Sequence, residues 1–86
     1  MYVVYIISGD GGKLYKGLTN NLSRRLAEHR RGKTRSTRTM GKLTVVYTEE
    51  YLDFGDARKR ELYFKSAAGR RFLTEILKIR GRSSIG

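Results

Sequence analysis

Two short runs of β-branched and aromatic residues near the start of the chain predict a β-hairpin. The first run covers residues 2–7 (Tyr-Val-Val-Tyr-Ile-Ile) and the second covers residues 14–18 (Leu-Tyr-Lys-Gly-Leu). Between them, residues 9–12 (Gly-Asp-Gly-Gly) are typical of a turn. Because side chains alternate between the two faces of a strand, we expect Tyr5 and Tyr15 to be neighbours on one face of this hairpin.

The rest of the pattern predicts three helices and a third strand. The expected elements are a helix over 22–31, an aperiodic basic loop over 33–42, a strand over 43–48, a helix from Asp53 or Asp56 to about Ala68, a break at Gly69 and a short helix over 71–79. This order, β-β-α-β-α-α, predicts an α/β or α+β sandwich in which helices flank a three-stranded, largely antiparallel sheet. We expect one domain over residues 1–80 and a frayed basic tail over residues 81–86.

Composition excludes several classes of protein. A chain of 86 residues has room for one domain. It contains no cysteine, which excludes a disulfide framework, a thiolate zinc site and a cysteine nucleophile. Its longest uncharged apolar stretch covers residues 2–7, far short of the roughly 20 residues of a membrane span, and no charged segment precedes it. We therefore expect a cytoplasmic protein with no membrane segment.

The charge balance indicates a polyanionic partner. The sequence has 19 Lys and Arg against 8 Asp and Glu, a net charge of +11. Nucleic acid is the first expectation and an anionic membrane surface the second, but no helix sets bulky apolar residues opposite its cations as membrane binding requires. The cations expected to contact a phosphate backbone, without reading bases, are Arg24, Arg30, Arg31, Lys33, Arg35 and Arg38.

Ionisable residues fall on the predicted buried face of the first helix. With a step of about 100° per residue, Arg25 and His29 border the stripe formed by Leu22 and Leu26. Arg24 points almost the opposite way. The arginines of this helix are therefore not equivalent, and Arg25 and His29 are either boundary residues that pack against the core or members of a site.

A carboxylate falls within the apolar stripe of the second predicted helix. That stripe consists of Phe54, Ala57, Phe64 and Ala68, and Glu61 lies among them. Burying an ionised carboxylate without a partner costs several kcal/mol. Glu61 therefore either pairs with an arginine such as Arg25 or serves as a site carboxylate for Mg²⁺ or Mn²⁺, which prefer oxygen ligands.

Taken together, these residues closely resemble the GIY-YIG nuclease domain, including the N-terminal nuclease domain of the excision-repair endonuclease. The matching positions are Val4-Tyr5-Ile6, Tyr15-Lys16-Gly17, Arg25, His29 and Glu61, and residues 60–73 are similar to the end of small stand-alone members. The first motif reads Val-Tyr-Ile instead of Gly-Ile-Tyr, and Lys16 replaces Ile. Strand alternation points Lys16 away from Tyr15, so this replacement should leave the site undisturbed.

The resemblance implies metal-dependent cleavage of phosphodiester bonds, in DNA rather than RNA, directed by backbone or structure. Tyr5 or Tyr15 would orient or deprotonate the attacking water, and Arg25 would stabilise the scissile phosphate through two guanidinium contacts. His29 would assist proton transfer or phosphate binding, and Glu61 would hold one Mg²⁺ or Mn²⁺ ion. Because the pKa of free tyrosine is near 10, the residues alone leave open whether a tyrosine or His29 is the base.

A second function fits the same basic surface. A non-catalytic or partner-dependent nucleic-acid-binding module would need the cations but not Glu61 on a core face. The sequence has no additional domain of the kind that selects targets in homing endonucleases or in the excision-repair endonuclease. A role in DNA repair and a protein partner that supplies specificity are therefore expectations from the resemblance.

Overall fold

The computed structural model describes the backbone of residues 1–85 and the side chains of residues 1–78. The elements in chain order are β1 (Tyr2–Ser8), the 3-10 turn η1 (Asp10–Gly12), β2 (Leu14–Thr19), α1 (Leu22–Arg30), α2 (Arg35–Arg38), β3 (Thr44–Tyr51), α3 (Phe54–Lys65) and α4 (Ala67–Ile85). The three strands form an antiparallel sheet in the order β2-β1-β3. The predicted α+β sandwich and its order of elements are confirmed, with α2 as an additional short helix.

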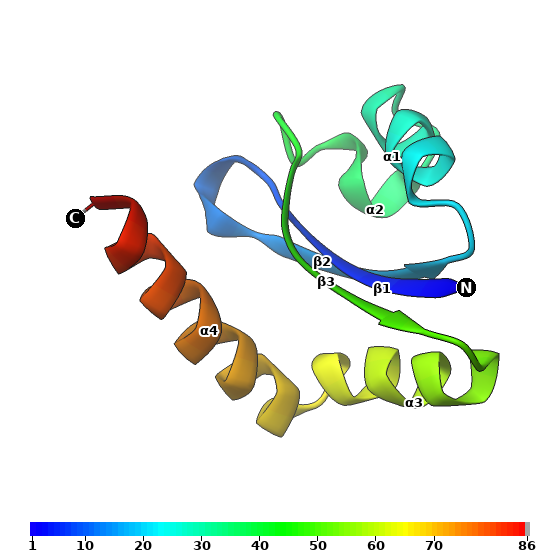
Figure 1. Ribbon diagram of the computed structural model, residues 1–86. Helices are drawn as coiled ribbons and strands as arrows, with labels where there is room; N and C mark the ends of the chain where they lie inside the picture. The colour runs from blue at the N-terminus through cyan, green and yellow to red at the C-terminus, as the bar shows by residue number, and fades with distance from the viewer. Residues whose placement is uncertain (86) are drawn as a thin grey trace.

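Strand alternation divides the core between the two faces of the sheet. Val4 and Ile6 of β1 pack against Ala57 and Phe64 of α3. The other face of β1 packs beneath α1 and the segment that leads into β3. Its cluster contains Tyr5, Ile7, Met40 and Leu43, with Val3, Tyr15, Leu22, Leu26 and Val45 packed around them. Figure 1 shows α1 and α2 on one side of the sheet and α3 on the other.

The predicted hairpin is confirmed, and so is the prediction that Tyr5 and Tyr15 lie on the same face of it. Tyr5 pairs with Gly17 and Ile7 pairs with Tyr15, so the two tyrosines share one face. The turn between the strands contains Gly11 and Gly12, both with φ of 83°. This left-handed conformation is one that glycine adopts at little cost, which explains the density of glycine in the turn.

The boundaries around α3 and α4 differ from those predicted. Asp53 caps α3 by accepting a hydrogen bond from the Asp56 backbone N–H, but the helix ends at Lys65 instead of near Ala68. The break lies at Ser66, whose hydroxyl accepts from the Gly69 N–H within the first turn of α4. Gly69 is thus inside a helix.

The position of Gly69 has a steric reason. A Cβ at this position would overlap the Tyr63 carbonyl oxygen, so glycine allows α4 to pack closely against the end of α3. The backbone of α4 then continues to Ile85, past the expected end at residue 79 and into the segment expected to be a frayed tail. Gly86 lies outside the described residues.

Other predicted elements shift for similar local reasons. β3 begins at Thr44 and extends to Tyr51, three residues beyond the expected end. Phe54, predicted to be buried, is 53% exposed because it opens α3 and only packs edge-on against Tyr2, with ring centroids 5.4 Å apart. Ala68 is exposed because it belongs to α4 and not to the stripe of α3. No helix in the described part of the chain has the length and apolar character to cross a membrane.

Candidate active site

The hairpin brings both motif tyrosines to the sheet face covered by α1. The ring centroids of Tyr5 and Tyr15 lie 6.2 Å apart. Gly17 is opposite Tyr5 on β2, and a Cβ there would overlap the tyrosine ring. A glycine at this position therefore lets the Tyr5 side chain lie across the neighbouring strand.

Helix α1 places His29 against the two tyrosines. The helix begins at the Asn21 cap, whose side chain accepts from the Arg24 backbone N–H at 3.0 Å. His29 Nε2 lies 2.9 Å from the Tyr5 hydroxyl, and the His29 ring packs edge-to-face on Tyr15 with centroids 4.9 Å apart. The prediction that His29 borders the buried face of this helix is confirmed, since His29 is 1% exposed.

Arg25 completes the cluster one helical turn before His29. The proximity of its guanidinium to Tyr5 is the largest cause that raises the pKa of Arg25, followed by Glu28, with Tyr15 a smaller cause. Glu28 also accepts from Arg25 Nη1 at 3.0 Å. Four of the five predicted catalytic side chains, Tyr5, Tyr15, Arg25 and His29, therefore converge.

Burial sets the protonation states of this cluster. Burial raises the pKa of Tyr5 to about 12, although the hydrogen bond from Arg25 opposes the shift. Burial, followed by the charge of Arg25, lowers the pKa of His29 below its usual value near 6.5. At neutral pH the cluster thus holds a protonated phenol, a neutral imidazole and a guanidinium.

The cluster has an inner and an outer part. Tyr5 is 0% exposed and His29 is 1% exposed, so neither reaches solvent. Tyr15 and Arg25 are half-buried. Arg25 also lines a surface pocket with residues from β1, β2, α1 and α3 and from the turn before α1. These residues are Tyr2, Leu18, Thr19, Asn20, Arg24, Glu28 and Phe54.

Thr37 is a member of the site that the sequence pattern does not single out. It belongs to α2, a four-residue helix too short to produce a hydrophobic period. Its hydroxyl oxygen lies 2.8 Å from His29 Nδ1, and Thr37 is 1% exposed. The assignment of residues 33–42 to an aperiodic loop is wrong at this helix, whose one buried residue makes this tertiary contact.

Glu61 is buried as predicted but stands apart from the other four side chains. It is 7% exposed on α3, the helix on the opposite side of the sheet from α1. Its carboxylate pairs with Arg58 Nη1 at 2.7 Å and with Lys65 Nζ at 3.1 Å, so the expected ion pair with an arginine is present, but with Arg58 and not with Arg25. Burial alone would raise the pKa of Glu61, but the hydrogen bonds from Arg58 and Lys65 outweigh it and lower the pKa.

The surroundings of Glu61 fit a metal ion only as one ligand among several. No group of three His, Cys, Asp or Glu side chains that could hold a metal ion is found among the described residues. A single ionised carboxylate is nevertheless a usual protein contribution to Mg²⁺, which keeps waters and takes substrate phosphate oxygens. Arg58 and Lys65 are each half exposed, so both side chains have room to turn away from Glu61.

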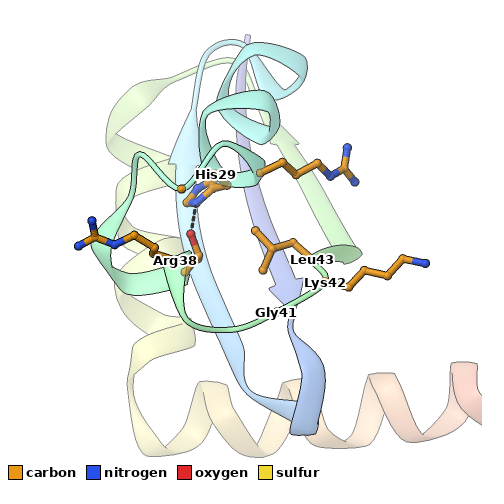
Figure 2. Close-up of a pocket in the computed structure, with 8 residues that line it drawn as sticks. His29, Arg38, Gly41, Lys42 and Leu43 are labelled. Atoms are coloured by element: carbon orange, nitrogen blue, oxygen red, sulfur yellow. Dashed lines mark hydrogen bonds between the residues drawn. The ribbon is translucent and has the colours of Figure 1, made fainter.

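The six predicted phosphate-contacting cations are all exposed. They are Arg24, Arg30, Arg31, Lys33, Arg35 and Arg38, and they follow α1, the turn after it and α2. A cavity lies between α1 and the segment that leads into β3. Figure 2 shows His29, Arg38, Gly41, Lys42 and Leu43 among its lining residues. Three cations, Arg30, Arg38 and Lys42, therefore lie around a cavity lined by His29.

Comparison with known proteins identifies this arrangement. Residues 1–73 match the GIY-YIG catalytic domain, which includes all five predicted catalytic positions. The chain belongs to the GIY-YIG family. The matched GIY-YIG domain spans most of the sequence.

Relatives of similar size extend the match. A UPF0213 protein of Orgyia pseudotsugata multicapsid polyhedrosis virus is 36% identical over 84 residues, covering 95% of this chain and 81% of that protein. A UPF0213 protein of Desulfotalea psychrophila is 38% identical over 66 residues, covering 74% of this chain and 60% of that protein. The solution structure of a UPF0213 protein of Bacillus halodurans matches with a TM-score of 0.56 and 29% identity, covering 88% of this GIY-YIG chain and 85% of that one.

Proposed function

We propose that this GIY-YIG protein is a metal-dependent endonuclease that cuts the DNA backbone with little base specificity. The observation that carries the proposal is the convergence of the Arg25 charge with Tyr5 and Tyr15 on one face of the sheet. A planar guanidinium next to phenol hydroxyls suits a phosphodiester, because it binds two phosphate oxygens and stabilises the charge that develops at phosphorus.

Burial assigns different roles to the predicted residues. Arg25 and Tyr15 are half-buried, so they are the groups that substrate reaches. We assign phosphate binding to Arg25 and orientation of the attacking water to Tyr15. Tyr5 and His29 are buried beneath them and position the outer pair. His29 is neutral at neutral pH, which suits a proton acceptor better than a phosphate-binding cation.

Glu61 is the residue that would hold the divalent ion. When bound, Mg²⁺ or Mn²⁺ supplies Lewis-acid polarisation of a phosphate oxygen and stabilisation of the leaving oxygen. The low pKa of Glu61 keeps its carboxylate ionised at neutral pH and therefore available as a ligand. The opposing charges of Arg58 and Lys65 satisfy the carboxylate in the free protein.

Nicking of supercoiled plasmid tests this function directly. We expect the wild type to nick plasmid with Mg²⁺ or Mn²⁺ and to lose this activity with a chelator. Arg25→Lys should reduce the rate about 100-fold, because a lysine ammonium cannot bind two phosphate oxygens at once. Arg24→Lys is the matched control, since Arg24 is exposed on the same helix and should tolerate the change. Equal rates for both variants would contradict the role of Arg25.

The basic surface predicts how binding depends on salt. Replacing Arg24 and Arg31 together by Ala should weaken binding to all DNA sequences and reduce the slope of log affinity against log salt by about 2, one unit for each lost phosphate contact. Fluorescence anisotropy of a labelled duplex at several salt concentrations measures this slope. An unchanged slope would place the DNA on another surface.

A non-catalytic or partner-dependent nucleic-acid-binding module is the second candidate function. It is favoured by the exposed cations along α1 and α2, which would bind DNA whether or not the cluster is active. Plasmid that is retarded in a gel but uncut by the wild type, with every metal, would support this function over the first.

A further inference from the structure

The hydrogen-bond network behind Tyr5 ends on α2. His29 Nδ1 lies 2.8 Å from Thr37 Oγ1, the contact drawn as a dashed line in Figure 2. The Thr37 hydroxyl in turn donates to the Thr34 carbonyl oxygen at 3.4 Å. Thr37 and His29 are each 1% exposed, so bulk water does not compete for these contacts.

The donors and acceptors of this network define the direction of each hydrogen bond. Assigning the single hydrogen of the Thr37 hydroxyl to the Thr34 carbonyl makes the Thr37 oxygen the acceptor of His29 Nδ1–H. Nε2 of the neutral ring then has a free lone pair, which accepts the Tyr5 hydroxyl 2.9 Å away.

The other neighbour of Tyr5 agrees with this direction. The positive charge of Arg25 acts on Tyr5 and opposes the rise that burial causes in its pKa, and a guanidinium can only donate. A cation on this side favours the Tyr5 oxygen facing Arg25, which leaves the hydroxyl hydrogen for His29 Nε2. The contact with Thr37 and the contact with Tyr5 are therefore both consistent with a proton on His29 Nδ1.

We propose that Thr37 is a positioning residue that holds neutral His29 in the Nδ1–H tautomer and thereby orients the Tyr5 hydroxyl oxygen toward Arg25. The catalytic consequence rests on the proposed function, whereas the tautomer does not. Thr37 also lies between Arg35 and Arg38, two cations expected to contact the DNA backbone. The same four-residue helix would therefore hold both the backbone of the substrate and the orientation of the site.

The tautomer is measurable without substrate, because His29 is the only histidine of the chain. In long-range ¹H–¹⁵N spectra at neutral pH, we expect one set of imidazole signals with a protonated Nδ1 and an unprotonated Nε2. Thr37→Val keeps the shape of the side chain but removes the acceptor, so the population should shift toward the Nε2–H form. Thr37→Ser should restore the wild-type spectrum, and Thr39→Val, an exposed change two residues away, should leave it unchanged.

Cleavage kinetics provide the second readout. Thr37→Val should lower kcat about 10- to 100-fold, the usual range for residues that orient a functional ligand from behind, with DNA affinity within about twofold of the wild type. Thr37→Ser should recover most of kcat. A loss in affinity equal to the loss in kcat would instead indicate a general disturbance of α2 and overturn the positioning role.

The spectra separate this proposal from the proposed function. A wild-type spectrum with Nε2–H, or a Thr37→Val spectrum identical to that of the wild type, would overturn the role of Thr37. If Thr37→Val does not fold, the wild-type and Thr37→Ser spectra still decide the tautomer. If the expected tautomers are found but no protein cuts DNA, the proposed function fails while the assignment of Thr37 to the His29 tautomer stands.

Discussion

Replacing Glu61 by Gln is expected to reduce metal-dependent nicking about 1000-fold, a loss of about 4 kcal/mol in transition-state stabilisation. The amide keeps the size of the side chain but loses the charge that a divalent ion needs. DNA affinity should stay unchanged or rise, because the change removes one negative charge from a protein that binds a polyanion. Plasmid nicking and anisotropy measure the two quantities on the same protein.

Folding of this variant is not expected to fail. The pairs of Glu61 with Arg58 and Lys65 lie on one helix at spacings of i,i+3 and i,i+4, with both cations half exposed. Because both cations reach solvent, water satisfies them when the charge of Glu61 is lost, and the amide oxygen can still accept a hydrogen bond. A thermal melt close to that of the wild type would therefore separate loss of activity from loss of structure.

A matched control and a direct metal readout complete this test. Glu50→Gln removes an exposed carboxylate from β3 and should leave nicking unchanged. Titration with Mn²⁺ should broaden NMR signals around Glu61 in the wild type and not in Glu61→Gln. Comparable nicking by both glutamine variants, with the same broadening, would contradict the metal role of Glu61.

The hairpin and α1 were predictable because their signals are local. Glycine-rich turn residues and β-branched runs define the hairpin, and the side-chain period of two then places Tyr5 and Tyr15 on one face. The asparagine cap and helical period of α1 place His29 toward the core. Four catalytic candidates converge because these local rules agree with the tertiary fold.

The parts that the sequence did not predict depend on contacts between distant segments. Helix α2 has no period of its own, and its one buried residue, Thr37, meets His29 across the connection from α1. The joint of α3 and α4 was misplaced because the glycine signal at Gly69 reflects close approach of two helices and not a break.

For Glu61, the sequence predicted the burial of the side chain but not the identity of its arginine partner. Its burial and an arginine partner followed from the helical period, but Arg25, the example given for that partner, is on the other side of the sheet. Arg58 and Lys65 stand three residues before and four residues after Glu61, which is the spacing of neighbours on a helix. That spacing was present in the sequence and identifies the correct pair.

Replacing Glu49 by Gln is expected to lower the free energy of unfolding by about 2 kcal/mol at pH 7, the largest stability effect among these predictions. Glu49 lies on β3 and accepts hydrogen bonds from the Tyr47 hydroxyl at 2.5 Å, the Tyr51 hydroxyl at 2.6 Å and Arg60 Nε at 2.8 Å. This cluster joins β3 to α3. Urea unfolding followed by circular dichroism measures the change.

The loss of stability is large because Arg60 contacts both the Glu49 carboxylate and three aromatic rings. Its guanidinium carbon lies 4.7 Å from the ring centroid of Phe64 and 4.8 Å from those of Tyr63 and Phe72. Removing the charge of Glu49 leaves the partly buried Arg60 among aromatic rings without its carboxylate partner. Since Phe72 belongs to α4, the loss should also loosen the joint between α3 and α4.

The pH dependence of the difference in unfolding free energy between the wild type and Glu49→Gln tests this explanation. Burial alone would raise the pKa of Glu49, but hydrogen bonds from Arg60, Tyr47 and Tyr51 outweigh it and lower the pKa in the folded protein. A carboxyl with a lowered folded pKa contributes stability that is present above its unfolded pKa of about 4.3 and is lost as the pH falls through the folded value. The stability gap between wild type and Glu49→Gln should therefore narrow toward pH 3. A gap that stays constant, or one matched by the exposed Glu50→Gln variant, would mean that the charge of Glu49 does not hold β3 to α3.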